Sequence, residues 1–269
     1  MRVTVLTPSK NQANFIDACL RSVHEQTYRT IEHIVLDGMS TDDTALIAAR
    51  YPCAFFQRKD SGPAQAINQG LNMASGDIVC WLNADDAFSS QTTIERIIRI
   101  FAEQPEVDVI TGDGYYINEQ GRYINPIVMT HPSRVSYKWI IREDFILQPA
   151  TFWRRNAFRL DERLKYCFDW QLWIDYFAAG LNILYVPQYF ALYRRQPSSL
   201  TQQDTASRRR EVYKMVKKHR NHGLLVVWCW LMWRSYQLSE VVRVPRLKRL
   251  MKVANALMKR VSYGFIVSS

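Results

Sequence analysis

The sequence has few cysteines, and those it has are scattered. Its 269 residues include five, at positions 19, 53, 80, 167 and 229, and their spacing matches no metal site. An odd, dispersed set of thiols is typical of a reducing compartment, so we predict a cytoplasmic location. The first apolar strand begins almost at residue 1, and we therefore expect no signal peptide.

Long apolar runs, internal repeats and low-complexity segments are also lacking. The apolar block at 223–233 is well short of the roughly 20 residues that a membrane-spanning helix needs. Hydrophobic residues nevertheless make up 48% of the chain, which is enough for a substantial core. We expect residues 1–205 to form one α/β domain.

Positive charge is concentrated at the end of the chain. Residues 206–269 hold 15 Lys and Arg against two Asp and Glu, whereas residues 1–205 hold 20 against 23. The basic residues of this tail border the tryptophan-rich block 223–233 and mix with apolar residues over 244–261. This composition predicts an amphipathic helical tail on an anionic membrane surface. Two alternatives remain: binding to nucleic acid, which we do not expect, and packing on the catalytic domain or a second subunit.

Short apolar strands alternate with helical stretches over the first 90 residues. The pattern predicts strands at 3–6, 31–36, 54–56 and 78–82, with helices at 15–26, 44–50 and 64–74. Strand–helix–strand repetition implies a parallel sheet with right-handed crossovers. In such sheets, ligands bind outside the carboxyl ends of the strands.

Polar clusters follow each of these four strands. They begin at Thr7, Asp37, Asp60 and the adjacent pair Asp85 and Asp86. Adjacent carboxylates repel each other unless a cation or a polyhydroxylated ligand uses them. Solvated turns are the plainer interpretation of any one cluster, but four clusters at corresponding strand ends are hard to explain as unrelated turns.

The clusters together form a recognisable series of motifs. They are Thr-Pro-Ser-Lys-Asn at 7–11, Asp-Gly-x-Ser-Thr-Asp-x-Thr at 37–44, Asp-x-Gly at 60–62, Ser-Gly-Asp at 75–77 and Leu-Asn-Ala-Asp-Asp at 82–86. The series resembles the inverting family 2 glycosyltransferases of the non-processive, bacterial surface-polysaccharide type, over about two-thirds of the chain. The resemblance implies an α/β GT-A fold with a Rossmann-like mixed sheet, followed here by a basic helical extension.

The resemblance also implies roles for individual residues. It places Thr7, Pro8, Asp37, Asp60 and Asp85 at the nucleotide-sugar donor, with Thr7 contacting the base through its backbone and hydroxyl, Asp37 accepting from a base N–H and Asp85 binding sugar hydroxyls. Asp86 is implied to hold a divalent cation, Mn²⁺ or Mg²⁺, ions that suit oxygen ligands and phosphates. Spacing alone does not separate Asp85 from Asp86.

Other polar residues near these motifs have structural interpretations. Asp42 and Asp43 favour capping of the helix that starts at Thr44, and Asn68 is as well explained by packing as by function. From the residues alone, Asp169 is equally well explained as the cap of a helix predicted at 170–179.

The resemblance instead implies that Asp169, which follows the Gln-Pro-Ala-Thr-Phe segment at 148–152, is the general base. Asp161, Glu162 and Asp175 are the alternative bases.

These observations predict an enzyme that moves one hexosyl or N-acetylhexosaminyl group, with inversion, from a nucleotide-diphospho-sugar to a glycan or polyprenyl-linked acceptor at the cytosolic membrane face. A UDP-sugar is the favoured donor. One alternative is a nucleotidyltransferase making nucleotide sugars, although residues 7–11 lack the glycines of a phosphate loop. The other is a non-catalytic, membrane-docking nucleotide-binding scaffold. Glycoside hydrolysis also uses paired carboxylates, but it needs no nucleotide site.

Overall fold

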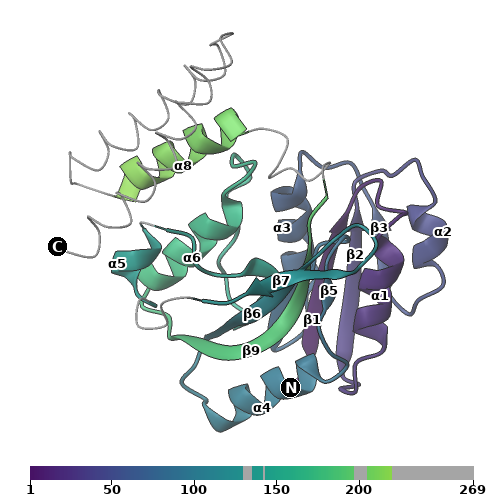
Figure 1. Cartoon of the computed structure of the whole chain (residues 1–269), viewed down its shortest axis with the longest axis horizontal. Helices are drawn as coiled ribbons and strands as arrows, with labels where there is room; N and C mark the ends of the chain where they lie inside the picture. Colours follow the sequence, from purple (N-terminus) through teal and green to yellow (C-terminus); the bar gives the residue numbers. More distant parts are fainter. Residues whose placement is uncertain (130–134, 142, 197–204, 220–269) are drawn as a thin grey trace. The chain divides into compact units, whose positions relative to one another are not determined.

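The computed structural model describes residues 1–129, 135–141, 143–196 and 205–219. The chain divides into two units, residues 1–199 and 200–269, which we describe separately. The strands of the first unit are β1 (Val3–Ser9), β2 (Ile31–Asp37), β3 (Ala54–Gln57), β4 (Ile78–Trp81), β5 (Ala87–Phe88), β6 (Val109–Ile117), β7 (Tyr123–Ile127), β8 (Thr151–Arg154) and β9 (Ile183–Arg194) (Figure 1). Its helices are α1 (Ile16–His24), α2 (Thr44–Ala48), α3 (Pro63–Met73), α4 (Thr93–Glu103), α5 (Tyr137–Ile140), α6 (Phe168–Ala178) and the 3₁₀ turn η2 (Gln148–Ala150).

One mixed sheet organises this unit. Its strand order is β3-β2-β1-β4-β8-β6-β9-β5, and β7 pairs with β6 beside that path. The pairs β1–β2, β1–β4 and β2–β3 are parallel, which confirms the parallel arrangement predicted for the first four strands. β8 runs antiparallel to both β4 and β6, so β6 has the same direction as β4. The carboxyl ends of β1 to β4 and of β6 therefore lie at one edge of the sheet.

Helices cover both faces of the sheet. On one face, Val5 and Ile78 pack in a buried cluster with Cys19 of α1 and Ile97 of α4. On the other face, Trp173 of α6 stacks on Trp81 of β4, with ring centroids 5.8 Å apart. The burial of both faces explains why these strands are short continuous apolar runs rather than alternating ones.

The second unit is described only over α8 (Thr205–His219). The apolar block 223–233 and the basic stretch 244–261 lie outside the described residues, so the predicted membrane tail remains a prediction. Among the helices of the described ranges, none is long and apolar enough to cross a membrane.

Candidate active site

The acidic pair lies directly beyond the carboxyl end of β4. Asp86 is 2% exposed. Its Oδ1 accepts the backbone N–H of Arg194 at 2.9 Å, and its Oδ2 accepts the side-chain amide of Asn83 at 3.1 Å. Burial, and then the neighbouring charge of Asp85, raises the pKa of Asp86 well above its ordinary value. Because both oxygens are engaged, this carboxylate anchors the end of β9 to the acidic segment.

Asp85 is the less buried member of the pair. Its Oδ2 accepts a hydrogen bond from Nε2 of Gln196 at 2.7 Å, and Gln196 is itself buried. Burial also raises the pKa of Asp85, while the Gln196 amide and the Arg194 charge oppose that change. Asp85 is therefore the more accessible carboxylate of the pair.

Arg194 ties three segments together at this edge. Its Nε donates to the backbone carbonyl of Asp85 at 2.8 Å, and its Nη1 donates to the carbonyls of Asn118 and Glu119 at 2.8 and 2.9 Å. The guanidinium also lies over the ring of Phe15, 5.1 Å from its centroid. The acidic segment, the turn between β6 and β7, and the start of α1 thus share one buried cation.

Asp37 and Asp60 meet at the same edge, at the ends of β2 and β3. Oδ2 of Asp37, which is 1% exposed, accepts the backbone N–H of Ser40 at 2.8 Å and the amide of Gln57 at 3.0 Å. Asp60 lies against Gly38, where an added Cβ would come within 2.8 Å of the Asp60 carboxylate. Burial raises the pKa of Asp60 and the charge of Asp37 adds to this, while Lys10 opposes it. The structure therefore brings together two of the predicted donor-site acids.

The predicted contact of the Thr7 hydroxyl with the base remains a prediction. Thr7 is fully buried, and its hydroxyl lies 2.9 Å from Nε2 of His33 inside the α1 side of the sheet. A contact from the backbone of Thr7, and the role of the neighbouring, buried Pro8, remain predictions. Ser9, which follows Pro8, has a buried hydroxyl without a hydrogen-bond partner among the described residues. The motif analysis gave this polar group no role.

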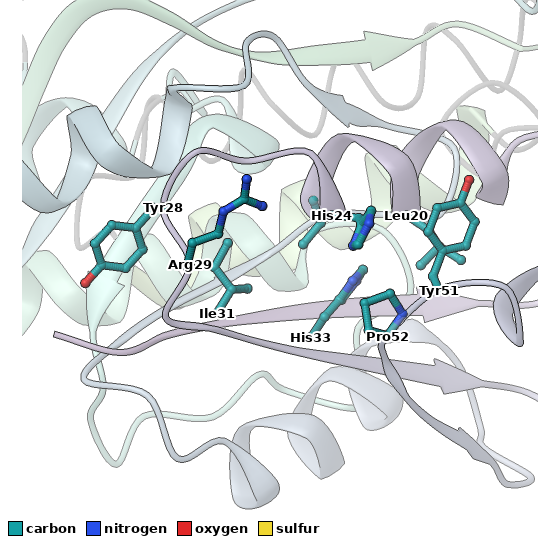
Figure 2. A pocket seen from close by; sticks show the side chains of 9 residues that line it. Leu20, His24, Tyr28, Arg29, Ile31, His33, Tyr51 and Pro52 are labelled. Atoms are coloured by element: carbon teal, nitrogen blue, oxygen red, sulfur yellow. The ribbon is translucent and has the colours of Figure 1, made fainter.

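A separate hollow of about 270 Å³ opens between α1 and β2. Figure 2 shows His33 beneath His24 there, with Arg29 on the side of Tyr28 and Ile31. None of its lining residues belongs to the predicted donor site. His33 connects the two regions, since its ring lines the hollow while it contacts Thr7.

Asp169 lies in the first turn of α6. The helix starts at Phe168 after Cys167, so Asp169 is inside the helix and is not its cap. The Asp169 carboxylate is partly exposed, and its Oδ1 accepts the backbone N–H of Trp170 at 2.8 Å. Asp169 thus accepts a backbone N–H at the start of α6 from a position inside the helix and not from the cap.

The segment 148–152 contacts the acidic segment. Gln148 donates from Nε2 to the carbonyl of Trp81 at 2.8 Å, and its Oε1 accepts from Asn83 at 3.2 Å. Asn83 therefore links Gln148 to Asp86.

Several other polar candidates have structural roles. Asn68 bonds both the N–H and the carbonyl of Leu160, which fixes α3 to the segment before α6. Asp42 accepts the backbone N–H groups of Thr44 and Ala13. Of the alternative bases, Asp161 pairs with Arg163, and Asp175 accepts from Gln171.

A divalent cation is compatible with the acidic pair. No group of three His, Cys, Asp or Glu side chains within the described ranges could hold a metal. Mg²⁺-type ions are, however, commonly held by one or two carboxylates together with substrate phosphates. The carboxylate of Asp85 fits such an arrangement, whereas both oxygens of Asp86 already accept hydrogen bonds.

Comparisons of the sequence with known proteins identify its family. Residues 4–164 match the model of the family described as glycosyl transferase family 2. An uncharacterised glycosyltransferase of Rickettsia typhi is 27% identical over 186 residues, which cover 65% of this chain and 58% of that protein. A PGL/p-HBAD biosynthesis glycosyltransferase of Mycobacterium bovis is 31% identical over 116 residues, covering 41% of this chain and 45% of that protein.

Solved structures resemble this chain in fold. TarS 1–349 of S. aureus in complex with UDP-GlcNAc has a TM-score of 0.68 at 17% identity, covering 95% of this chain and 79% of that one. The mannosyltransferase PcManGT of Pyrobaculum calidifontis, in complex with GDP-Man and Mn²⁺, has a TM-score of 0.59 at 19% identity, covering 81% and 62%. The matches with curated relatives span well under two-thirds of those proteins' lengths.

Proposed function

Because the chain belongs to glycosyl transferase family 2 and has the GT-A fold, we propose that it transfers one sugar from a nucleotide-diphospho-sugar to an acceptor hydroxyl with inversion. The observation that carries this proposal is the meeting of Asp37, Asp60 and Asp85 at one sheet edge. A nucleotide sugar needs an acceptor for its base, polar partners for its hydroxyls and compensation for its diphosphate charge.

Asp37 and Asp60 form the nucleoside side of the proposed donor site. Both oxygens of the Asp37 carboxylate accept hydrogen bonds from Ser40 or Gln57. In this proposal a base N–H replaces one of these donors when the nucleoside binds. The complex of TarS with UDP-GlcNAc supports a UDP-sugar donor.

Asp85 and Asp86 form the diphosphate side. We assign the metal contact predicted for Asp86 to Asp85, because Asp86 is buried with both oxygens hydrogen-bonded. Asp86 then fixes the acidic segment through its hydrogen bonds with Arg194 and Asn83. When bound, Mn²⁺ or Mg²⁺ offsets the negative charge of the departing nucleoside diphosphate. The complex of PcManGT with GDP-Man and Mn²⁺ supports this use of a metal.

Asp169 is the proposed general base. An ordinary aspartate is ionised at neutral pH, since its reference pKa is about 3.9. Its carboxylate takes the proton of the acceptor hydroxyl while that oxygen attacks the anomeric carbon. The C1–diphosphate bond breaks on the opposite side of the sugar, so the configuration inverts.

The acceptor in this proposal is a glycan or a lipid-linked glycan used in surface-polysaccharide synthesis. The basic tail, 206–269, is proposed to hold the enzyme on an anionic membrane surface. Flotation with vesicles tests the tail: binding should rise with anionic lipid and fall with salt, because screening acts over about 8–10 Å. Binding that ignores both lipid charge and salt would contradict it.

The donor proposal is tested by calorimetry and by product assay. The full chain should bind UDP more tightly with Mn²⁺ than with chelator, and it should release UDP slowly from a UDP-sugar. Asp37→Ala should weaken binding of uridine with or without metal, whereas Glu25→Ala, an exposed acid outside the site, should not. A chain that binds no nucleoside diphosphate with any metal would disprove the proposal.

A further inference from the structure

Three tyrosines from three strands form one partly exposed aromatic cluster beyond the predicted motifs. The rings of Tyr115 on β6 and Tyr189 on β9 are stacked, with centroids 4.1 Å apart and planes 19° from parallel. Tyr123 on β7 meets Tyr115 edge-on, with centroids 5.1 Å apart, and is 64% exposed. Single exposed aromatic residues are ordinary, but a contiguous group of them marks a binding surface.

The strands that carry this tyrosine cluster are fixed by buried polar contacts. Asp113 on β6 is 4% exposed, and its Oδ1 accepts the hydroxyl of Tyr185 at 2.8 Å and the backbone N–H of Met129 at 3.0 Å. These bonds hold the chain after β7 against β9. At the other end of β6, Arg194 holds the β6–β7 turn to the carbonyl of Asp85. The cluster is therefore rigidly connected to the proposed donor site.

The tyrosine cluster lies on the same sheet face as the proposed base. Phe190 of β9 and Phe152 of β8 contact each other within the core cluster that α4 covers. Successive side chains of a strand point to opposite faces, so Trp153 on β8 points the other way. On β6, Ile110 belongs to the α4 cluster and an added Cβ at Gly112 would meet the Phe190 ring. Tyr115, three positions after Gly112, therefore points away from α4, and Tyr189 stacks on it. Trp153 contacts Trp173 of α6, the helix whose first turn contains Asp169. Figure 1 shows β6, β7 and β9 running together across this part of the unit.

The chemistry of the cluster suits a saccharide. A pyranose ring presents C–H groups on its faces, and these carry partial positive charge that is attracted to the negative face of an aromatic ring. Tyrosine hydroxyls at the ring edges can bond sugar hydroxyls. The one carboxylate among the contacts that hold the cluster, Asp113, is buried and already accepts two hydrogen bonds.

We propose that Tyr115, Tyr123 and Tyr189 bind the glycan of the acceptor by ring stacking and so direct its reactive hydroxyl toward Asp169. This inference rests on the proposed function for the identity of the acceptor. The neutral, aromatic character of the surface favours a glycan over a charged partner.

The test is affinity electrophoresis of the full chain, run toward the cathode because its net charge is +10. The native gels contain dextran, yeast mannan, galactomannan or hydroxyethyl cellulose as the saccharide probe. We expect at least one polymer to retard the protein. Tyr123→Ser should weaken that retardation by roughly three- to tenfold, the range expected for loss of one aromatic contact.

Two matched controls accompany this variant. Tyr137→Ser makes the same change at a 39% exposed tyrosine of α5, and Ile124→Ser removes an exposed apolar neighbour on β7; both should be retarded like the wild type. UDP binding is measured for every variant and should not change. If the wild type does not bind UDP, the donor proposal is wrong. The gel result would still show whether the tyrosine cluster binds saccharide.

Three results would overturn the inference. The first is absence of retardation by all four polymers, and the second is equal retardation of the wild type and Tyr123→Ser. The third is a different occupant: vesicle binding or concentration-dependent dimerisation that Tyr123→Ser abolishes, which would assign the surface to lipid or to a second copy of the chain.

Discussion

The side-chain amide of Gln196 donates to the carboxylate of Asp85 at 2.7 Å, although the two residues are 111 positions apart in sequence. The bond joins the end of β9 to the loop after β4, and Gln196 is buried. A carboxylate that accepts such a bond is held in one orientation, which lowers the free-energy cost of organising the site when a donor binds.

Replacing Gln196 should therefore weaken donor binding more than it weakens the fold. A hydrogen bond to a charged group contributes about 1.5–3 kcal/mol, so Gln196→Ala should raise the Kd for UDP with Mn²⁺ by roughly 10- to 100-fold. Calorimetry measures this effect. Gln188→Ala, at an exposed glutamine of the same strand, is the control and should bind normally. Unchanged affinity of Gln196→Ala would show that the amide does not position Asp85.

The two adjacent aspartates should behave differently when each becomes asparagine. Asp85→Asn should abolish the Mn²⁺-dependent increase in UDP affinity and leave the melting temperature nearly unchanged. Asp86→Asn places an amide N–H against the Asn83 amide, which should destabilise the fold by about 1–3 kcal/mol while Mn²⁺-dependent binding persists. Thermal unfolding and calorimetry on both variants separate the two roles. If Asp86→Asn instead abolishes the Mn²⁺-dependent increase in UDP affinity and Asp85→Asn does not, Asp86 is the metal ligand.

Asp169→Asn should separate chemistry from binding. The asparagine Oδ1 can still accept the N–H of Trp170, so the helix and the UDP affinity should be preserved. Turnover should fall by roughly 10²- to 10⁴-fold, the usual contribution of a general base. Asp175→Asn, a change on the same helix, is the matched control and should retain turnover. Survival of activity in Asp169→Asn would instead make Asp161, Glu162 or Asp175 the candidate base.

His33 should make stability depend on pH. Burial lowers its pKa from 6.5 to about 4. The unfolded chain therefore binds this proton first, and the folded state loses stability as pH falls from about 6.5 to 4. At about 1.4 kcal/mol per pKa unit, the loss approaches 3 kcal/mol.

Urea unfolding at pH 7.5 and 4.5 tests this effect. His33→Gln can keep a hydrogen bond to Thr7 but cannot titrate, so its stability difference between the two pH values should be smaller than that of the wild type by about that amount. His24→Gln, at the exposed histidine above the same hollow, should retain the wild-type difference (Figure 2). Identical pH dependence in wild type and His33→Gln would contradict the assignment.

The first half of the fold could be predicted from the sequence because its signals are local. Apolar runs ended by polar turns located β1 to β4 within a few residues, and the spacing between them located α1 to α3. The order of the polar clusters then placed Asp37, Asp60 and Asp85 at one edge, since parallel strands end on the same side.

Only the tertiary structure decided how the second half completes the site. β9 pairs with β6 through two register shifts, and no local pattern predicts that pairing or the position of Arg194 and Gln196 beside the acidic pair. The same contacts decide that Asp86 is buried while Asp85 is less so, a distinction that two identical adjacent side chains cannot express in sequence. Local propensity fixes where strands begin and end, but burial and hydrogen bonding depend on which distant segments the folded chain brings together.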